Sequence, residues 1–323
     1  MRRFHIFAAG LALAAYGAIA PAEEFPSHPM RMIIPTPAGG GADAIARLLG
    51  EKMQERMGQP VVVENRPGGD TIIGTRLVAT SPPDGYTMLL TYSLVAVQPS
   101  LKKHLPYDVR RDLAPVIDLM EAPSLVTVRN GLPVNTMQDL IALVRAEPGK
   151  YSYSDGGTGG PSHLSAELFN SLTGGKLLRV PYKGSAPSLT DLAGGHVDMS
   201  FSTIVSAQPY VRTGRMKALA VTGKRRSPVF PELPTVAEAG LPDYEYVTWY
   251  GIFVTGGTPK PIVDKLYGVM REIVETPEMK QLFAEQGAQV VGTGPQEFGA
   301  YIDGEIKKWA RVVKDARIPV DED

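Results

Sequence analysis

The stretch MRMIIPTPAGGGADAIARLLGEKM, residues 30–53, decides the fold of this chain. Its first part, Met30–Pro35, is apolar enough for a buried strand and leads into a loop with three consecutive glycines. Apolar side chains then recur at the spacing of one helix face across Ala42–Met57, at Ile45, Leu48, Leu49 and Met53. The stretch therefore predicts a strand, a glycine-rich loop and a helix, which begin a β-α-β unit.

The same alternation continues after this helix. Strands are predicted at Val61–Val63 and Tyr86–Leu90, and a helix at Ile72–Ala79 ends at the sequence SPPDG. This β-α-β-α-β order implies a parallel sheet with helices on both faces. A second series begins near Ser124, with helices predicted at Met137–Arg145, Ser162–Leu172 and Pro187–Ala193, and strands at Tyr151–Tyr153, Leu178–Val180, Val197–Phe201 and Ala218–Thr222.

The C-terminal part has a different pattern. Tyr246–Val254 is predicted to be a long apolar strand. Three helices are then expected to begin at Thr258-Pro259, Thr276-Pro277 and Gly294-Pro295, because proline is tolerated in the first helical turn. Two α/β units of similar size predict two lobes around a cleft, and the pattern leaves open which lobe holds the C-terminal helices.

The first 22 residues are predicted to be an export signal. Arg2 and Arg3 precede an uncharged, mostly apolar run that ends in Ala20-Pro21-Ala22, which fits an A-x-A cleavage site. Cleavage is expected after Ala22, and cleavage after Ala20 is the alternative. A membrane anchor is disfavoured because the run is shorter than the roughly 20 residues that a span needs. The protein is therefore expected to work outside the cytoplasm.

Charge and composition exclude several classes of partner and chemistry. Without residues 1–22 the chain has 31 basic and 34 acidic residues, and this near-neutral balance argues against nucleic acid or anionic membrane as a partner. The absence of cysteine excludes a thiol nucleophile, and with no H-E-x-x-H sequence no metal site is predicted. A hydrolase is disfavoured because there is no G-x-S-x-G sequence, although Ser93 with His163 is a conceivable pair.

The first glycine-rich loop, PTPAGGGAD at residues 35–43, is predicted to bind an anion. It joins a strand to a helix, where free N–H groups and the positive end of the helix dipole point at a ligand. One alternative is a plain turn capped by Asp43. Another is a dinucleotide site, since Gly39, Gly41 and Ala44 match G-x-G-x-x-G/A and Glu64 follows at a strand end. Export counts against a nicotinamide cofactor, and none is predicted.

The second glycine-rich loop, SDGGTGGPSH at residues 154–163, has the same setting. Thr158 or Ser162 is expected to cap the following helix or to donate a hydroxyl to a ligand. His163 lies in the first helical turn, where the dipole favours its neutral form. The alternative for His163 is a histidine satisfied by local hydrogen bonding.

Seven segments together resemble the Bug family, the substrate-binding proteins of tripartite tricarboxylate transporters. The resemblance runs from Phe25 to about Ala316, nearly the whole chain after the predicted signal. The segments are PTPAGGGADAIARLL (35–49), GQPVVVENRPGGDTIIG (58–74), SPPDGYTMLL (81–90), LPYDVRRDLAPV (105–116), SDGGTGGPSHLSAELF (154–169), VPYKGSAPSLTDLAGGHVDMSF (180–201) and RSPVFPELPTVAEAGLPDYE (226–245).

The resemblance implies an α/β fold of the two-lobed Venus-flytrap type found in periplasmic binding proteins, each lobe a mostly parallel sheet flanked by helices. The implied crossings lie near residues 122–125 and 246–251, which gives lobe 1 residues 23–123 and 249–323 and lobe 2 residues 124–248. The resemblance thus returns the C-terminal helices to lobe 1. It also implies a small organic-acid ligand, held in the cleft by N–H groups and hydroxyls, without an arginine clamp. A diacid is expected to place one carboxylate on each glycine-rich loop.

The expected ligand-binding residues come from both lobes. They are Thr36, Ala38, Gly39, Gly40, Tyr92 and Ser93 in lobe 1, and Thr158, Ser162, His163, Tyr182 and Asp198 in lobe 2. Asp198 either contacts ligand through water or anchors the lobe, and Trp249 and Tyr250 either line the hinge or are core. Thr36 and Ala38 replace an aromatic residue and a proline common in the family, which hints at a roomier or more polar pocket.

The resemblance implies a binding protein that is not an enzyme. Its expected partners are the membrane subunits of a transporter or, alternatively, a membrane sensor, and the protein is expected to be a monomer. The ligand is expected to be an aliphatic dicarboxylate or an aromatic acid.

Overall fold

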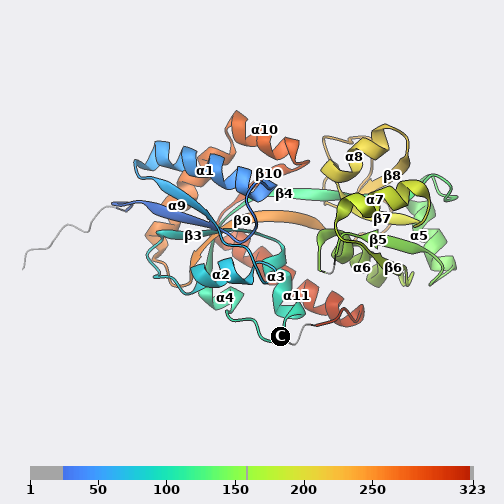
Figure 1. Cartoon of the computed structure of the whole chain (residues 1–323), viewed down its shortest axis with the longest axis horizontal. Coiled ribbons are helices and arrows are strands. Elements are labelled where there is room, and N and C mark those ends of the chain that lie inside the picture. The colour runs from blue at the N-terminus through green and yellow to red at the C-terminus, as the bar shows by residue number, and fades with distance from the viewer. Residues whose placement is uncertain (1–24, 158, 321–323) are drawn as a thin grey trace, which may run out of the picture.

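The computed structural model describes residues 25–157 and 159–320 and places them in two lobes side by side, joined by long strands (Figure 1). A ten-stranded sheet runs through both lobes in the order β2-β1-β3-β9-β4-β7-β5-β6, with β10 and β8 each pairing with β4. The predicted signal peptide and its two cleavage sites lie outside the described residues. Within the described ranges, no helix combines the length and apolar character needed to cross a membrane.

Lobe 1 contains the predicted β-α-β-α-β unit. Its parallel strands are β1 (Met30–Ile34), β2 (Val61–Asn65) and β3 (Thr87–Tyr92). One sheet face is covered by α1 (Gly41–Met57), α9 (Lys260–Val274) and α10 (Pro277–Glu285). The other face is covered by α2 (Ile72–Ala79), α3 (Leu94–Leu101), α4 (Val109–Asp112) and α11 (Pro295–Asp315).

Lobe 2 has a similar plan. Its parallel strands are β5 (Ser152–Asp155), β6 (Leu178–Pro181) and β7 (Met199–Thr203), with β8 (Met216–Val221) beside β4. Its helices are α5 (Met137–Ala146), α6 (Pro161–Thr173), α7 (Ser185–Gly194) and α8 (Ile204–Arg212). Because antiparallel strands join the parallel ones in both lobes, each sheet is mixed.

The two lobes are connected through β4 (Leu113–Arg129) and β9 (Val247–Thr255). Residues 113–123 of β4 pair antiparallel with β9, and residues 124–129 pair with β7 and β8 of lobe 2. The strand β10 (Gln289–Thr293) completes lobe 1 on β4. One continuous strand therefore belongs to both sheets.

The C-terminal helix α11 extends across the junction (Figure 1). Its first half buries Phe298, Ile302 and Ile306 against lobe 1. Its last turns and the residues after it bury Trp309, Val312, Val313 and Ile318 in the same apolar cluster as the core of lobe 2. Trp309 stacks edge-on against Tyr246 at a centroid distance of 5.7 Å. The helix thus ties the two cores together beneath the crossing strands.

The two-lobed α/β fold predicted from the sequence is confirmed, and helices follow the Pro259, Pro277 and Pro295 signals. Five elements were not predicted, namely α3, α4, β4, α8 and β10. The strand β4 was missed because Pro115 and Pro123 argue against a central strand. In the structure Pro115 lies beside a register shift, and Pro123 precedes the point where β4 changes partners. The lobe boundaries at 123/124 and 248/249 stay predictions.

Gly251, on β9, has no room for a side chain. A Cβ atom there would overlap the Phe298 ring and lie 3.1 Å from the Ile117 carbonyl oxygen. We expect Gly251→Ala to lower the free energy of unfolding by about 1–3 kcal/mol, the usual cost of overpacking. Urea unfolding followed by circular dichroism will measure it.

Gly268, in α9, is the matched control, because a Cβ atom there would meet nothing within 4 Å. Gly268→Ala is expected to raise the free energy of unfolding by up to about 1 kcal/mol. Equal effects of the two substitutions would contradict the close contact at Gly251.

Candidate functional site

A cavity of about 720 Å³ lies between the lobes, in the range typical of small-molecule sites. Lobe 1 contributes a wall from the first glycine-rich loop and a floor from the central strands, and lobe 2 contributes the facing wall. The lining residues are Thr36, Pro37, Ala38, Gly39, Gly40, Gly41, Ala42, Tyr92, Met120, Ala122, Pro161, Thr203, Val205, Ser206, Thr248, Tyr250 and Gln286. None of these described lining residues is Lys or Arg.

The lobe 1 wall is the N-terminus of α1. Gly40 is the residue before the helix and makes no side-chain cap, so the first N–H groups of the helix face the cavity uncapped. A Cβ atom added at Gly39 or Gly40 would meet no heavy atom within 4 Å, so a ligand can approach the backbone closely. The 17-residue helix also directs the positive end of its dipole at this point. This wall has the properties of an anion site.

Asp43 holds the loop without occupying the cavity. Its carboxylate accepts the Gly39 N–H at 3.0 Å and pairs with Arg47 at 3.0 Å, one helical turn away. The Arg47 guanidinium, together with the Gly39 N–H, lowers the pKa of Asp43, so the carboxylate stays ionised and neutralised by Arg47. Asp43 thus takes the Gly39 N–H of the loop and does not cap the helix itself, so the N–H groups beyond Gly39 remain available.

The floor is one face of the central sheet. Tyr250 on β9 pairs with Tyr92 on β3 and with Met120 on β4, so the three side chains form a row. Thr248 and Ala122 form the next row on the same face. The rings of Tyr92 and Tyr250 lie 5.8 Å apart and tilted. Burial raises the pKa of Tyr92 to about 12, so its hydroxyl stays neutral at physiological pH.

The lobe 2 wall comes mainly from α8, which the sequence did not indicate. Thr203, at the end of β7, donates its hydroxyl to the Ser206 hydroxyl at 2.9 Å. Val205 is 47% exposed and lines the cavity beside them. Pro161, the first residue of α6, is the contribution of the second glycine-rich loop region to the lining. The helix α8 was missed because its start carries neither a glycine-rich loop nor a charged cap.

In the second glycine-rich loop, three backbone N–H groups donate hydrogen bonds to side chains of the same loop. Gly156 donates to the Ser162 hydroxyl at 3.0 Å, and Gly159 donates to Nδ1 of His163 at 3.0 Å. Gly157 donates to the Asp155 carboxylate at 2.7 Å. The predicted clamp, with one carboxylate of a diacid on each loop, is therefore not prepared in this structure.

Arg179 fixes this arrangement from behind the loop. Its guanidinium makes two hydrogen bonds to the fully buried Asp155 carboxylate, at 2.6 and 3.1 Å. Burial and the nearby Arg179 charge lower the pKa of His163 from its ordinary 6.5 to about 4, so the ring is neutral. Since Nδ1 accepts the Gly159 N–H, the proton of the neutral ring sits on Nε2. The alternative of a locally satisfied histidine thus describes His163.

Five of the predicted ligand residues, namely Thr36, Ala38, Gly39, Gly40 and Tyr92, line the cavity together, and Tyr250 joins them. Ser93 and Trp249 are buried and absent from the lining, and Thr158 lies outside the described residues. Tyr182 donates its hydroxyl to Asp191 at 2.6 Å. Ser162 and His163 are engaged within their loop.

Asp198 makes structural contacts within lobe 2. It precedes β7, at the end of the strand away from Thr203 and the cavity. Its carboxylate pairs with Arg129 at 2.9 Å and accepts the Ser152 N–H at 2.9 Å. It therefore links β7 to both neighbouring strands, β4 and β5, which is the anchoring role considered for it, and contact with ligand through water stays a prediction.

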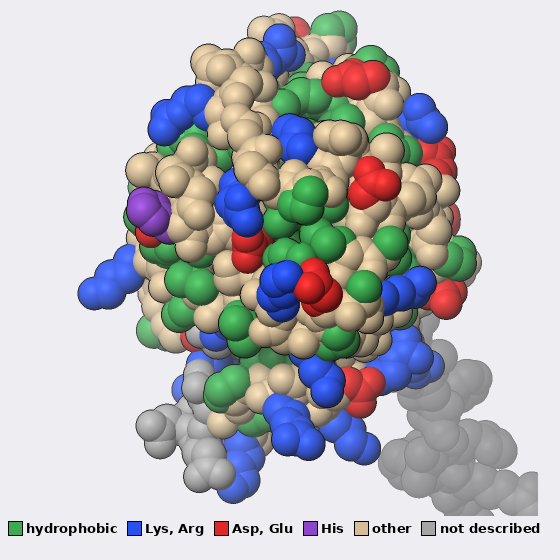
Figure 2. Space-filling view, turned by 90° about the vertical axis from the view of Figure 1, so that its right-hand side faces the viewer, with side chains coloured by type: hydrophobic (Ala, Val, Ile, Leu, Met, Phe, Trp, Pro, Cys, Tyr) green, Lys and Arg blue, Asp and Glu red, His purple; other side chains and the backbone are tan. Residues whose placement is uncertain are grey.

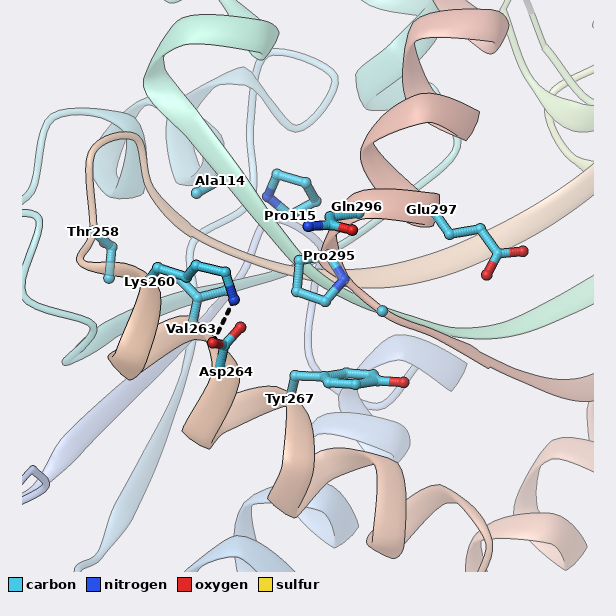
Figure 3. Close-up of a pocket in the computed structure, with 11 residues that line it drawn as sticks. Ala114, Pro115, Thr258, Lys260, Val263, Asp264, Tyr267, Pro295, Gln296 and Glu297 are labelled. Carbon is cyan, nitrogen blue, oxygen red and sulfur yellow. Dashed lines mark hydrogen bonds and ion pairs between the residues drawn. The ribbon is translucent and has the colours of Figure 1, made fainter.

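A second cavity of about 670 Å³ lies on lobe 1 (Figure 3). It is lined by the start of β4, by α9 and by the N-terminus of α11, with Lys260 paired to Asp264 at 2.5 Å. All of these elements belong to one lobe. Closure of the two lobes cannot enclose a ligand there, so the cavity between the lobes is the better candidate.

The rival chemistries find little support in the described residues. Ser93 donates its backbone N–H to the Trp249 carbonyl, and His163 is held by Gly159, so no hydrogen bond joins the serine to the histidine. No cluster of three or more His, Cys, Asp or Glu side chains within residues 25–157 and 159–320 is suited to a metal ion. On the side of the molecule shown in Figure 2, basic and acidic side chains are interspersed, with several basic ones along the lower edge.

Comparison with known proteins connects this chain to a receptor family. Residues 45–318 match the family model described as "Tripartite tricarboxylate transporter family receptor". The protein BugT of Bordetella pertussis is 36% identical over 310 residues, which cover 95% of each chain.

Two solved structures resemble this chain over most of its length. A Rhodopseudomonas palustris protein, Rpa4515 with adipate, is 35% identical, with a TM-score of 0.73 over 92% of this chain and 99% of its own. A TctC solute-binding protein from Polaromonas without ligand is 29% identical, with a TM-score of 0.82 over 90% of this chain and 99% of its own.

The buried neutral His163 predicts how stability depends on pH. Because its pKa is depressed in the folded state, its contribution is fully present above pH 6.5 and is lost as the pH falls from 6.5 toward 4. The loss amounts to at most roughly 3 kcal/mol. His163→Gln should show a smaller fall in the free energy of unfolding than the wild type, measured by urea unfolding between pH 7.5 and 4.5.

His196, which is exposed, provides the control. His196→Gln should keep the pH dependence of the wild type. A His163→Gln variant with the same pH dependence as the wild type would rule out the buried neutral ring.

Proposed function

Because the chain belongs to the tripartite tricarboxylate transporter receptor family, we propose that it is an extracytoplasmic solute-binding protein that captures a small organic acid between its lobes. Its ligand carboxylate binds at the N-terminus of α1, around Gly39 and Gly40. The protein delivers this ligand to the membrane subunits of a tripartite transporter. The family is one of receptors, and no catalytic step is part of the proposal.

The observation that carries the proposal is the uncapped N-terminus of α1, which opens into the cavity between the lobes. Charge-assisted hydrogen bonds contribute roughly 1.5–3 kcal/mol each, and a helix dipole in a partly buried site adds up to about 2 kcal/mol. Two or three such bonds with the dipole approach the roughly 8 kcal/mol of micromolar binding. The relative crystallised with adipate supports a carboxylate as the ligand.

Ligand binding is proposed to favour closure. The cavity is lined by both lobes, so a bound acid gains contacts with Thr203, Val205 and Ser206 as the lobes approach. Only contacts that differ between the open and closed states shift this equilibrium. We propose that the chain crosses between lobes at 123/124 and 248/249, which the exchange of β4 partners after Pro123 supports.

Location and assembly also belong to the proposal. The related structure described as the periplasmic binding protein BugD is 34% identical and covers 91% of this chain, which supports a periplasmic location after removal of residues 1–22. We propose that the protein is a monomer and that a single molecule of it binds the transporter.

The test uses a substitution that separates folding from binding. Gly40 has extended backbone angles and free space for a side chain, so Gly40→Asp should fold and should cap α1 with its own carboxylate. That carboxylate would occupy the N–H groups and repel an anion. We expect carboxylate affinity to fall by about 100-fold, the equivalent of one lost charge-assisted hydrogen bond, with no loss of melting temperature.

Isothermal titration of purified protein with mono- and dicarboxylic acids will measure the affinities. Gly40→Ala is the matched control, because it adds a Cβ atom and leaves the N–H groups free. The proposal fails if no carboxylate binds to the wild type, or if Gly40→Asp binds its acids as tightly as Gly40→Ala does.

A further inference from the structure

We propose that the N-terminus of α8 is a second anion-binding site in the cavity, and that it holds the far carboxylate of an aliphatic dicarboxylate. This inference rests on the proposed function, since it takes the α1 N-terminus as the site of the first carboxylate. It differs from the arrangement expected from the sequence, in which the second glycine-rich loop holds the second carboxylate. It is carried by the lobe 2 wall, by two buried hydroxyls beside that wall and by the turn between α10 and β10.

The first turn of α8 faces the cavity without a cap. No side chain accepts a hydrogen bond from its first N–H groups, and Thr203, Val205 and Ser206 all line the cavity. These N–H groups have no partner within the helix, and the helix dipole places positive charge there. Thr203 donates its hydroxyl to Ser206, so the proton of the Ser206 hydroxyl is left for a ligand. The described lining contains no Asp or Glu that would repel an anion at this point.

Two buried hydroxyls without partners lie beside this helix start. Ser124 is fully buried and pairs with Thr203, so the two side chains lie on the same face of the sheet. Ala122, two residues earlier on β4, lines the cavity on that face and pairs with Thr248, which is 6% exposed. Neither the Ser124 nor the Thr248 hydroxyl oxygen has a hydrogen-bond partner among the described residues. Buried polar groups are rarely left so, and these two therefore point to a polar ligand group at the lobe 2 end of the cavity.

The turn between α10 and β10 touches both helix N-termini. The Gln286 amide nitrogen lies 3.5 Å from the carbonyl oxygen of Gly41, the first residue of α1. The next residue, Gly287, has a left-handed φ of 67°, and a Cβ atom there would lie 2.9 Å from the Cβ of Ile204, the first residue of α8. Because the starts of α1 and α8 contact the same turn, one small ligand can reach both.

The floor between the two sites offers carbon surface. Tyr92 and Tyr250 present two tilted rings, and Met120 lies in the same row on β4. A methylene chain gains from burial on this surface. A charged group there would lose its water and gain no charged partner, which is costly. A ligand with two charged ends and an apolar middle therefore matches the cavity.

The experiment compares acids that differ only in the second carboxylate. Isothermal titration of the full mature protein uses three pairs of equal chain length, namely butanoate with succinate, pentanoate with glutarate and hexanoate with adipate. We expect the dicarboxylate of at least one pair to bind at least about tenfold more tightly than its monocarboxylate, the equivalent of one charge-assisted hydrogen bond.

A negative charge placed at the start of α8 should remove this preference. Val205 is 47% exposed, and an acidic residue in the first turn of a helix is favourable, so Val205→Asp should fold. Val205→Asn is the matched control, with the same shape and no charge. For the preferred pair, we expect the ratio of dicarboxylate to monocarboxylate affinity to be at least about tenfold lower in Val205→Asp than in Val205→Asn.

A second pair of variants distinguishes α8 from the second glycine-rich loop. Ser206→Ala removes the hydroxyl that is proposed to donate to the far carboxylate. Ser162→Ala removes the hydroxyl that accepts the Gly156 N–H in the loop. We expect Ser206→Ala to lower the affinity ratio about tenfold relative to Ser162→Ala, because a hydrogen bond to a charged group is lost only in the first. Melting temperatures of all four variants will show that they fold.

The outcomes separate this inference from the proposed function. Monocarboxylates that bind the wild type as tightly as the dicarboxylates of every pair would overturn the inference and leave a carboxylate receptor in place. Equal affinity ratios in Val205→Asp and Val205→Asn would overturn it too, as would a larger effect of Ser162→Ala than of Ser206→Ala. Binding of no acid at all would overturn the proposed function as well.

Discussion

The antiparallel pairing of β4 with β9 is the constraint on which the rest of the molecule depends. The 17 residues of β4 take part in the sheets of both lobes, so one backbone fixes where each lobe stands. One face of this pair, with Met120 and Tyr250, is left open between the lobes and becomes the floor of the cavity. The other face, with Trp249 and Gly251, is covered by Phe298 of α11. One face of β4 and β9 therefore forms the floor of the cavity, and the opposite face packs against α11, the helix that contacts both lobes.

The described lining of the cavity contains no Lys or Arg. Recognition of a negative ligand therefore depends mainly on main-chain geometry. The two glycine-rich loops look alike in sequence, yet their hydrogen bonds differ. In the first, Asp43 takes only the Gly39 N–H and leaves the helix terminus free. In the second, three side chains satisfy the loop from within. An acceptor supplied by the protein competes with an acceptor supplied by a ligand, so two loops of similar sequence differ in the N–H groups that they leave free.

The sequence predicted the fold and the lobe 1 wall because both rest on local patterns. Strand, glycine loop and helix follow one another directly around Gly40, and the spacing of apolar residues gives their order. The lobe 2 wall could not be predicted from local sequence patterns. Val205 begins a short helix without a distinctive cap, and the pair of Arg179 with Asp155 exists only because β6 lies beside β5. Prediction of the floor would have required the pairing register of β4, and the prolines in β4 argue against a central strand there.

The helix α11 has a consequence for the order in which this chain acquires structure. Phe298 completes one apolar core and Trp309 the other, and both come from the last element of the sequence. Neither core can be finished until nearly the whole polypeptide has been synthesised. A chain that ends before α11 would therefore leave both of these apolar clusters incomplete, so the two lobes depend on the same C-terminal helix for their final packing.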